Sequence, residues 1–146
     1  MSDINADLPR VSWMRAIAGG AFWAVVYNLV WGLAWFTFMR REWRDAFAAI
    51  KRPLPFTADV WILWIALTLP IGVALVAYAR NPARSVSAPK AAVYAGMTLW
   101  LLMTLGMATW GWQASLSIRI IVLDSIVNLI AMVAASLAGG WRQREA

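Results

Sequence analysis

The chain has 146 residues, of which 62% are hydrophobic and 14% charged, and its formal net charge is +6. It contains no cysteine and no histidine, which excludes disulfides, thiolate nucleophiles and metal sites built on thiolate or imidazole. The basic residues flank the apolar stretches and do not gather on one folded face, so the positive charge indicates anchoring at a membrane and not nucleic-acid binding.

Four apolar segments are each long enough to cross a bilayer, which requires about 20 residues. They cover roughly residues 17–39, 60–79, 91–112 and 120–141 and leave polar ends and three short connections. We therefore predict one all-α domain over residues 1–146, a polytopic membrane protein built as a bundle of four transmembrane helices. The N-terminus starts acidic and the first segment is longer than a signal-peptide core, so we expect this segment to be retained.

Two ridges run along the first segment with a spacing of four residues, which places the members of each ridge on one helix face. The aromatic ridge consists of Trp23, Tyr27, Trp31 and Trp35, and the neighbouring ridge consists of Gly20, Ala24, Asn28 and Gly32. Small residues at this spacing let another helix approach closely. Trp31 lies near mid-membrane, and we expect Asn28 or Asp124 to accept a hydrogen bond from its indole N–H.

Residues 40–50 place Trp43, Phe47 and Ile50 on one stripe, with most of the charged residues off it. This pattern is typical of a helix lying in the membrane interface, and a continuation of the first helix beyond the membrane explains it equally well. The Lys and Arg residues divide seven against six between the two sides, which leaves the orientation open. The five cations of residues 40–52 favour the cytoplasmic side for this connection, with both termini outside.

The second segment contains Pro70, which interrupts the helical hydrogen bonds and either shapes a cavity or only adjusts the packing. The third segment has a further small-residue ridge with one large aromatic residue, made of Gly96, Trp100, Thr104 and Ala108. Aromatic residues near the segment ends are expected at membrane interfaces and need no special function. This group contains Trp13, Trp43, Trp61, Trp110, Trp112 and Trp141.

Asp124 is the only formally charged residue within the four segments. At about 100° per residue it shares a face of the fourth segment with Asn128 and several alanines, while Arg119 lies about 140° away and is a poor partner. The opposite face is apolar and suits lipid. A carboxylate inside a membrane is costly, and it serves either as a polar anchor between helices or as the counter-charge of a ligand or proton site.

The candidate site follows from the side chains that could surround this carboxylate. Aromatic faces attract cations, so Trp31, Trp35 and Trp100 with Asp124 could form a box for a positively charged molecule. The full candidate set of polar or ligand-binding residues is Asp124, Asn128, Asn28, Trp31, Trp35 and Trp100. We predict no catalytic residue, no metal site and no cofactor, because the apolar segments hold no second acid or base beside Asp124.

Two stretches resemble a bacterial four-helix membrane protein family, catalogued as a domain of unknown function. The first runs over residues 31–46 and has an aromatic pair, Trp35-Phe36, followed by the basic and aromatic residues Arg41, Trp43 and Arg44. The second runs over residues 116–141 and combines Arg119, the apolar residues 120–123, Asp124 and a tail of small residues. Relatives often have Pro where this chain has Thr37 and His where it has Asn128, so a proton-handling role of that His does not transfer. The resemblance implies a helix bundle and no activity.

These observations predict a small integral membrane protein that is not an enzyme and that packs with itself or with a membrane-protein partner, as the three small-residue ridges indicate. The alternative is binding or transport of an apolar or cationic small molecule in an aromatic-lined cavity, with Asp124 as counter-charge. The lipid bilayer is an expected partner and nucleic acid is not. The preference for Arg and Ala over Lys is typical of a GC-rich bacterium, hence of a multi-pass protein in the cytoplasmic (inner) membrane.

Overall fold

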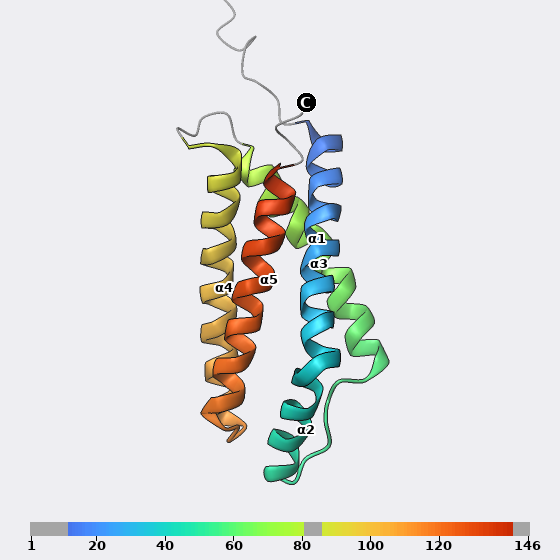
Figure 1. Cartoon of the computed structure of the whole chain (residues 1–146), viewed down its shortest axis with the longest axis vertical. Helices are drawn as coiled ribbons and strands as arrows, with labels where there is room; N and C mark the ends of the chain where they lie inside the picture. Colours follow the sequence, from blue (N-terminus) through green and yellow to red (C-terminus); the bar gives the residue numbers. More distant parts are fainter. Residues whose placement is uncertain (1–11, 81–85, 142–146) are drawn as a thin grey trace, which may run out of the picture.

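The structure, a computed structural model, describes residues 12–80 and 86–141. These residues form helices α1 (Trp13–Ala34), η1 (Trp35–Met39), α2 (Arg40–Ala49), α3 (Ala58–Ala79), α4 (Ala88–Gln113) and α5 (Ile118–Trp141), and no strand. The long helices lie side by side along one axis, with α1 beginning and α5 ending at the same end of the bundle (Figure 1). The predicted all-α bundle of four helices is confirmed.

Four helical stretches are long and apolar enough to cross a membrane: Trp13–Ala49, Ala58–Ala79, Ala88–Gln113 and Ile118–Gly140. At a rise of 1.5 Å per residue, about 22 residues span roughly 33 Å, slightly more than the hydrocarbon core of a bilayer. Large apolar side chains such as Leu33, Ile62 and Leu102 are exposed on the outer faces of these helices. Such faces suit lipid, and the chain is a small multi-pass membrane protein.

The first long helix contains a π-helical turn, η1, between α1 and α2. Buried residues recur every fourth position through all three parts: Trp23, Tyr27, Trp31, Trp35, Met39, Trp43 and Phe47. In an α-helix each step of four residues drifts by about 40°, so a long ridge would rotate away from the bundle. A π-turn winds less per residue and returns Trp43 and Phe47 to the buried side. The Thr37 hydroxyl donates to the carbonyls of Leu33 and Ala34 at this turn.

Residues 40–49 therefore follow the first helix without a break. This agrees with the interpretation that they continue the first helix. The stripe that suggested an interfacial helix packs inward, because Trp43 and Phe47 are both buried. Their rings contact Trp110 of α4 at 6.3 Å between centroids. Helix α2 is thus part of the protein core. An interfacial helix would instead have placed this apolar stripe against lipid.

Helix α1 is central, packing against α3 on one side and α5 on the other, while α4 packs against α5. Glycines allow these close approaches: a Cβ added at Gly72 would lie 2.5 Å from the Gly20 carbonyl oxygen. A Cβ at Gly96 would lie 2.5 Å from the Ser136 hydroxyl oxygen. Small-residue ridges predicted to receive a partner are thus largely occupied by helices of the same chain.

Substituting Ala for Gly72 is expected to destabilise the bundle by about 1–3 kcal/mol, since the added methyl group would overlap the α1 backbone. Gly32→Ala is the matched control, because a Cβ at Gly32 meets nothing within 4 Å. This control should gain as much as ~1 kcal/mol from the better helix propensity of Ala. Thermal unfolding of both variants in the same detergent tests the expectation, and equal melting temperatures would contradict it.

Helix α5 has the two faces that its sequence predicts. Asp124, Asn128, Ala131 and Ala135 are buried, whereas Val122, Ile126 and Leu137 on the opposite side are about half exposed. The small residues of the inner face let α5 lie against both α1 and α4. The predicted distinction between a protein-facing and a lipid-facing side of this helix is confirmed.

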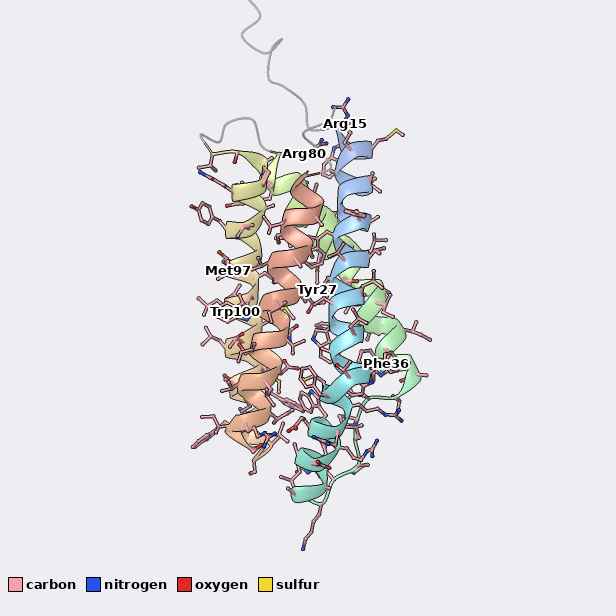
Figure 2. The ribbon with its side chains drawn as sticks, in the orientation of Figure 1. Arg15, Tyr27, Phe36, Arg80, Met97 and Trp100 are labelled. Carbon is pink, nitrogen blue, oxygen red and sulfur yellow. The ribbon has the colours of Figure 1, made fainter. Side chains whose placement is uncertain are left out.

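Helices α3 and α4 meet at the end of the bundle where α3 ends. Ala79, Ala91 and Ala92 form a small buried cluster there. Figure 1 shows α3 running obliquely, so that its beginning lies on the far side of α1 from α4. Arg15 and Arg80 lie at the end where α3 and α4 meet (Figure 2), and burial together with the Arg15 guanidinium lowers the pKa of Arg80. This end of the bundle suits the headgroup region.

Candidate functional site

Asp124 and Asn128 lie one turn apart on α5 and face α1. The Asn128 amide donates to the Asp124 carboxylate at 2.8 Å and to the Asp124 backbone carbonyl at 2.9 Å. The hydroxyl of Tyr27, which lies in the bundle interior (Figure 2), donates to the Asn128 side-chain oxygen. The polar line Tyr27–Asn128–Asp124 therefore joins α1 to α5, and it satisfies the Asn128 amide.

The Asp124 carboxylate has no cationic partner within the described residues. It is 8% exposed and takes part in no ion pair there. At the same end of the bundle, the Arg119 guanidinium forms an ion pair with the Glu42 carboxylate at 2.9 Å between nitrogen and oxygen. The indole N–H of Trp43 lies near this carboxylate without meeting hydrogen-bond geometry. A buried carboxylate with one amide donor and an indole beside it lacks the compensation that buried charges usually have.

A cavity of about 410 Å³ lies beside this carboxylate. We name it the tryptophan cavity, and its wall is made of Trp31, Trp43, Phe56, Val60, Trp61, Leu63, Trp64, Leu67, Met103, Thr104, Gly106, Met107, Trp110, Asp124 and Asn128. Helices α1, α2, α3, α4 and α5 all contribute to it. A volume of this size is typical of small-molecule sites, which are mostly apolar with a few polar groups.

The aromatic rings of the wall contact one another and form a connected surface. Trp31 and Trp61 have ring centroids 5.5 Å apart in an edge-to-face arrangement, and Trp43 and Phe56 are related in the same way at 5.1 Å. Phe56 and Trp61 lie 5.9 Å apart and link these two pairs, whereas Trp64 contacts Tyr27, which is not part of the wall, at 6.4 Å. Such arrangements stabilise the rings against one another.

Two of these tryptophans have unsatisfied polar groups. The indole N–H groups of Trp31 and Trp43 are buried and have no hydrogen-bond partner among the described residues. The expectation that Asn28 or Asp124 accepts from Trp31 is therefore wrong. An unpaired buried donor costs about 1–3 kcal/mol, and such exceptions are concentrated at functional sites and at places that hold water.

Of the six predicted site residues, the tryptophan cavity brings together Asp124, Asn128 and Trp31. Trp35 and Asn28 line a neighbouring cavity of about 510 Å³ that shares Trp31, Phe56, Trp61 and Trp64 with the first. Asn28 donates at 2.8 Å both to the Thr68 hydroxyl of α3 and to the Ala24 carbonyl, so its amide joins α1 to α3.

Trp100 lies elsewhere. Its indole N–H donates to the Ser125 carbonyl of α5 at 2.8 Å, which fastens α4 to α5. Figure 2 shows it on α4. Trp100 is absent from the tryptophan cavity, so the predicted box of Trp31, Trp35 and Trp100 around Asp124 is not assembled as such.

Several residues of the tryptophan cavity were assigned by sequence only to membrane interfaces. They are Trp43, Trp61 and Trp110, and Phe56 and Trp64 were not singled out as site residues. A signal existed for Trp43, because the four-residue spacing of the aromatic ridge continues from Trp35 through Met39 to Trp43. For the others, no spacing in the sequence indicates that the start of α3 faces the end of α4.

A third hollow, which we name the polar cleft, lies at the outer end of α2 and α5. It has a volume of about 720 Å³ and is lined by charged and small polar residues, among them Arg41, Glu42, Asp45, Ser117 and Arg119. Asp45 and Arg119 are exposed. This cleft is open to water or headgroups, in contrast to the apolar tryptophan cavity.

Comparisons with models of protein families, with curated proteins and with solved structures found no match. The resemblance to a bacterial four-helix family therefore stays a prediction.

Proposed function

We propose that this protein binds a small apolar molecule with one positive charge in the tryptophan cavity, as a non-enzymatic component of a bacterial cytoplasmic membrane. The observation that carries the proposal is the position of Asp124, a buried carboxylate without a cationic partner among the described residues, at the wall of a cavity lined by five tryptophans. Aromatic faces and a carboxylate are both attractive to an organic cation, most strongly where water is excluded.

The cavity discriminates by charge and by polarity. An anion would meet the Asp124 carboxylate, and a strongly polar molecule would lose its hydration against indole and aliphatic side chains. A neutral apolar molecule would fill the space but leave the carboxylate uncompensated. Quaternary and tertiary ammonium groups attached to an apolar body fit all three conditions.

Association with a second copy or with a membrane partner stays a prediction with reduced support. Its basis was the small-residue ridges, and Gly20, Gly72 and Gly96 pack against helices of the same chain. The exposed outer faces carry large apolar side chains that lipid also covers. Among the residues that the structure describes, no specific contact favours a protein partner over lipid.

The test is equilibrium binding of benzyltrimethylammonium to the purified protein in lipid nanodiscs. We expect saturable quenching of tryptophan fluorescence at millimolar or lower concentration, and much weaker binding of neopentylbenzene, the uncharged isostere of this cation. Trp100→Phe is a control that should bind the cation as the wild type does, because Trp100 lies outside the cavity. An unchanged spectrum, or equal affinity for the cation and its neutral isostere, would reject the proposal.

A further inference from the structure

The wall of the tryptophan cavity is closed on the side of α1, α2 and α5 and open on the side of α3 and α4. Its residues from the first three helices are buried: Trp31, Trp43, Asp124 and Asn128. Its residues from the other two include side chains that lie on the outer, lipid-facing surface. Leu63 is 60% exposed and Leu67 47%, and Gly106 is exposed as well.

The divergence of α3 and α4 explains this opening. The two helices touch through alanines at the end where α3 finishes and α4 begins. Toward the opposite end α3 runs obliquely, away from α4 (Figure 1), and the cavity lies there. On the α4 side the edge of the opening is Gly106, where an added Cβ would meet nothing within 4 Å. A residue without a side chain keeps the gap clear at that point.

The route from the aqueous end is obstructed by packed rings and by an ion pair. Trp43 lies edge-to-face with Phe56 at 5.1 Å and contacts Trp110 at 6.3 Å. Beyond them the Arg119 guanidinium donates to Glu42 at 2.9 Å, and the neighbouring residues Leu116 and Ile120 are buried. A molecule coming from the polar cleft would have to displace these groups, whereas one dissolved in the bilayer meets the gap directly.

We infer that the ligand reaches the tryptophan cavity sideways from the lipid, through the gap between α3 and α4 at Gly106, and that it is a membrane-dissolved cationic amphiphile. Its ammonium group lies at Asp124 and its hydrocarbon tail lies in the gap beside Leu63 and Leu67. This inference rests on the proposed function and adds the route and the ligand class. The carboxylate of Asp124 specifies the cationic end of such a molecule, and the exposed apolar side chains of Leu63 and Leu67 specify its hydrocarbon end.

The first experiment measures the rate of association of decyltrimethylammonium with the protein in nanodiscs. Gly106→Leu would fill the gap and is expected to slow association by about tenfold or more, because binding then requires the helices to part. Gly32→Leu is the matched control, since it makes the same exchange on α1 at a position outside the tryptophan cavity where an added Cβ likewise meets nothing within 4 Å. The control should associate at the wild-type rate.

The second experiment locates the tail in the wild-type protein. A decyltrimethylammonium probe with a photoreactive diazirine at the end of its tail should label Leu63, Leu67 or Met103, identified by mass spectrometry. Labelling of the polar cleft at Arg41 or Ser117, or an unchanged rate in Gly106→Leu, would overturn the lateral route while benzyltrimethylammonium binding upholds the proposed function. If neither ammonium compound binds the wild type, the proposed function and this inference both fail.

Discussion

Asp124→Asn should weaken the binding of benzyltrimethylammonium by about 30-fold or more, which corresponds to ~2 kcal/mol, while the melting temperature stays within a few degrees of the wild type. The Asn side chain has nearly the same shape, and its carbonyl oxygen can still accept the hydrogen bond from the Asn128 amide. The substitution therefore removes the charge and keeps the helix contact. Isothermal titration calorimetry and thermal unfolding in the same nanodiscs measure the two quantities.

The control for this variant is Asp45→Asn, which makes the same exchange in the exposed polar cleft. It removes one negative charge from the same end of the bundle without touching the tryptophan cavity, so cation affinity should stay at the wild-type value. If Asp124→Asn binds the cation as tightly as the wild type, the carboxylate is not the counter-charge. If the variant fails to fold, Asp124 is a structural anchor.

Asn128→Ala is expected to lower the free energy of unfolding by about 2–4 kcal/mol. The substitution leaves the Tyr27 hydroxyl without its acceptor and the Asp124 carboxylate without its amide donor, and both groups are buried. Unfolding of the variant in a detergent titration measures the loss. Tyr27→Phe removes only one partner and should cost about 1 kcal/mol.

A double-mutant cycle of Asn128→Ala with Tyr27→Phe should show coupling, with a combined loss smaller than the sum of the single losses. Asn28→Ala is the matched control at another interhelical amide. It should cost about 1 kcal/mol, because the Thr68 hydroxyl that it leaves still bonds to the Ile65 carbonyl. Wild-type stability of Asn128→Ala would contradict the polar line between α1 and α5.

The elements of the bundle could be predicted because they depend on local pattern. Runs of about 20 apolar residues determine the four spanning helices. The position of Asp124 relative to Asn128, and the division of α5 into an inner and an outer face, follow from 100° per residue. The Asp124–Asn128 hydrogen bond joins two residues four positions apart on one helix, so spacing was enough to suggest it.

The composition of the cavity could not be predicted because it depends on how helices cross. Trp100 has a spacing on α4 that suits a site, yet its N–H meets the Ser125 carbonyl of α5. Trp43 reaches the cavity only because the π-turn at Trp35–Met39 changes the register of the first helix. Trp61 and Trp110 have the sequence positions of interface anchors, and only the way α3 and α4 pack against the rest of the bundle places both on the wall of one cavity.

The most direct test of a cation site at Asp124 is the position of a bromine atom in a crystal of the protein soaked with 4-bromobenzyltrimethylammonium. We predict an anomalous bromine peak inside the tryptophan cavity, between Trp61 and Met107, with the ammonium group toward Asp124. A peak in the polar cleft beside Asp45, or no peak at a concentration that saturates binding, would contradict the account.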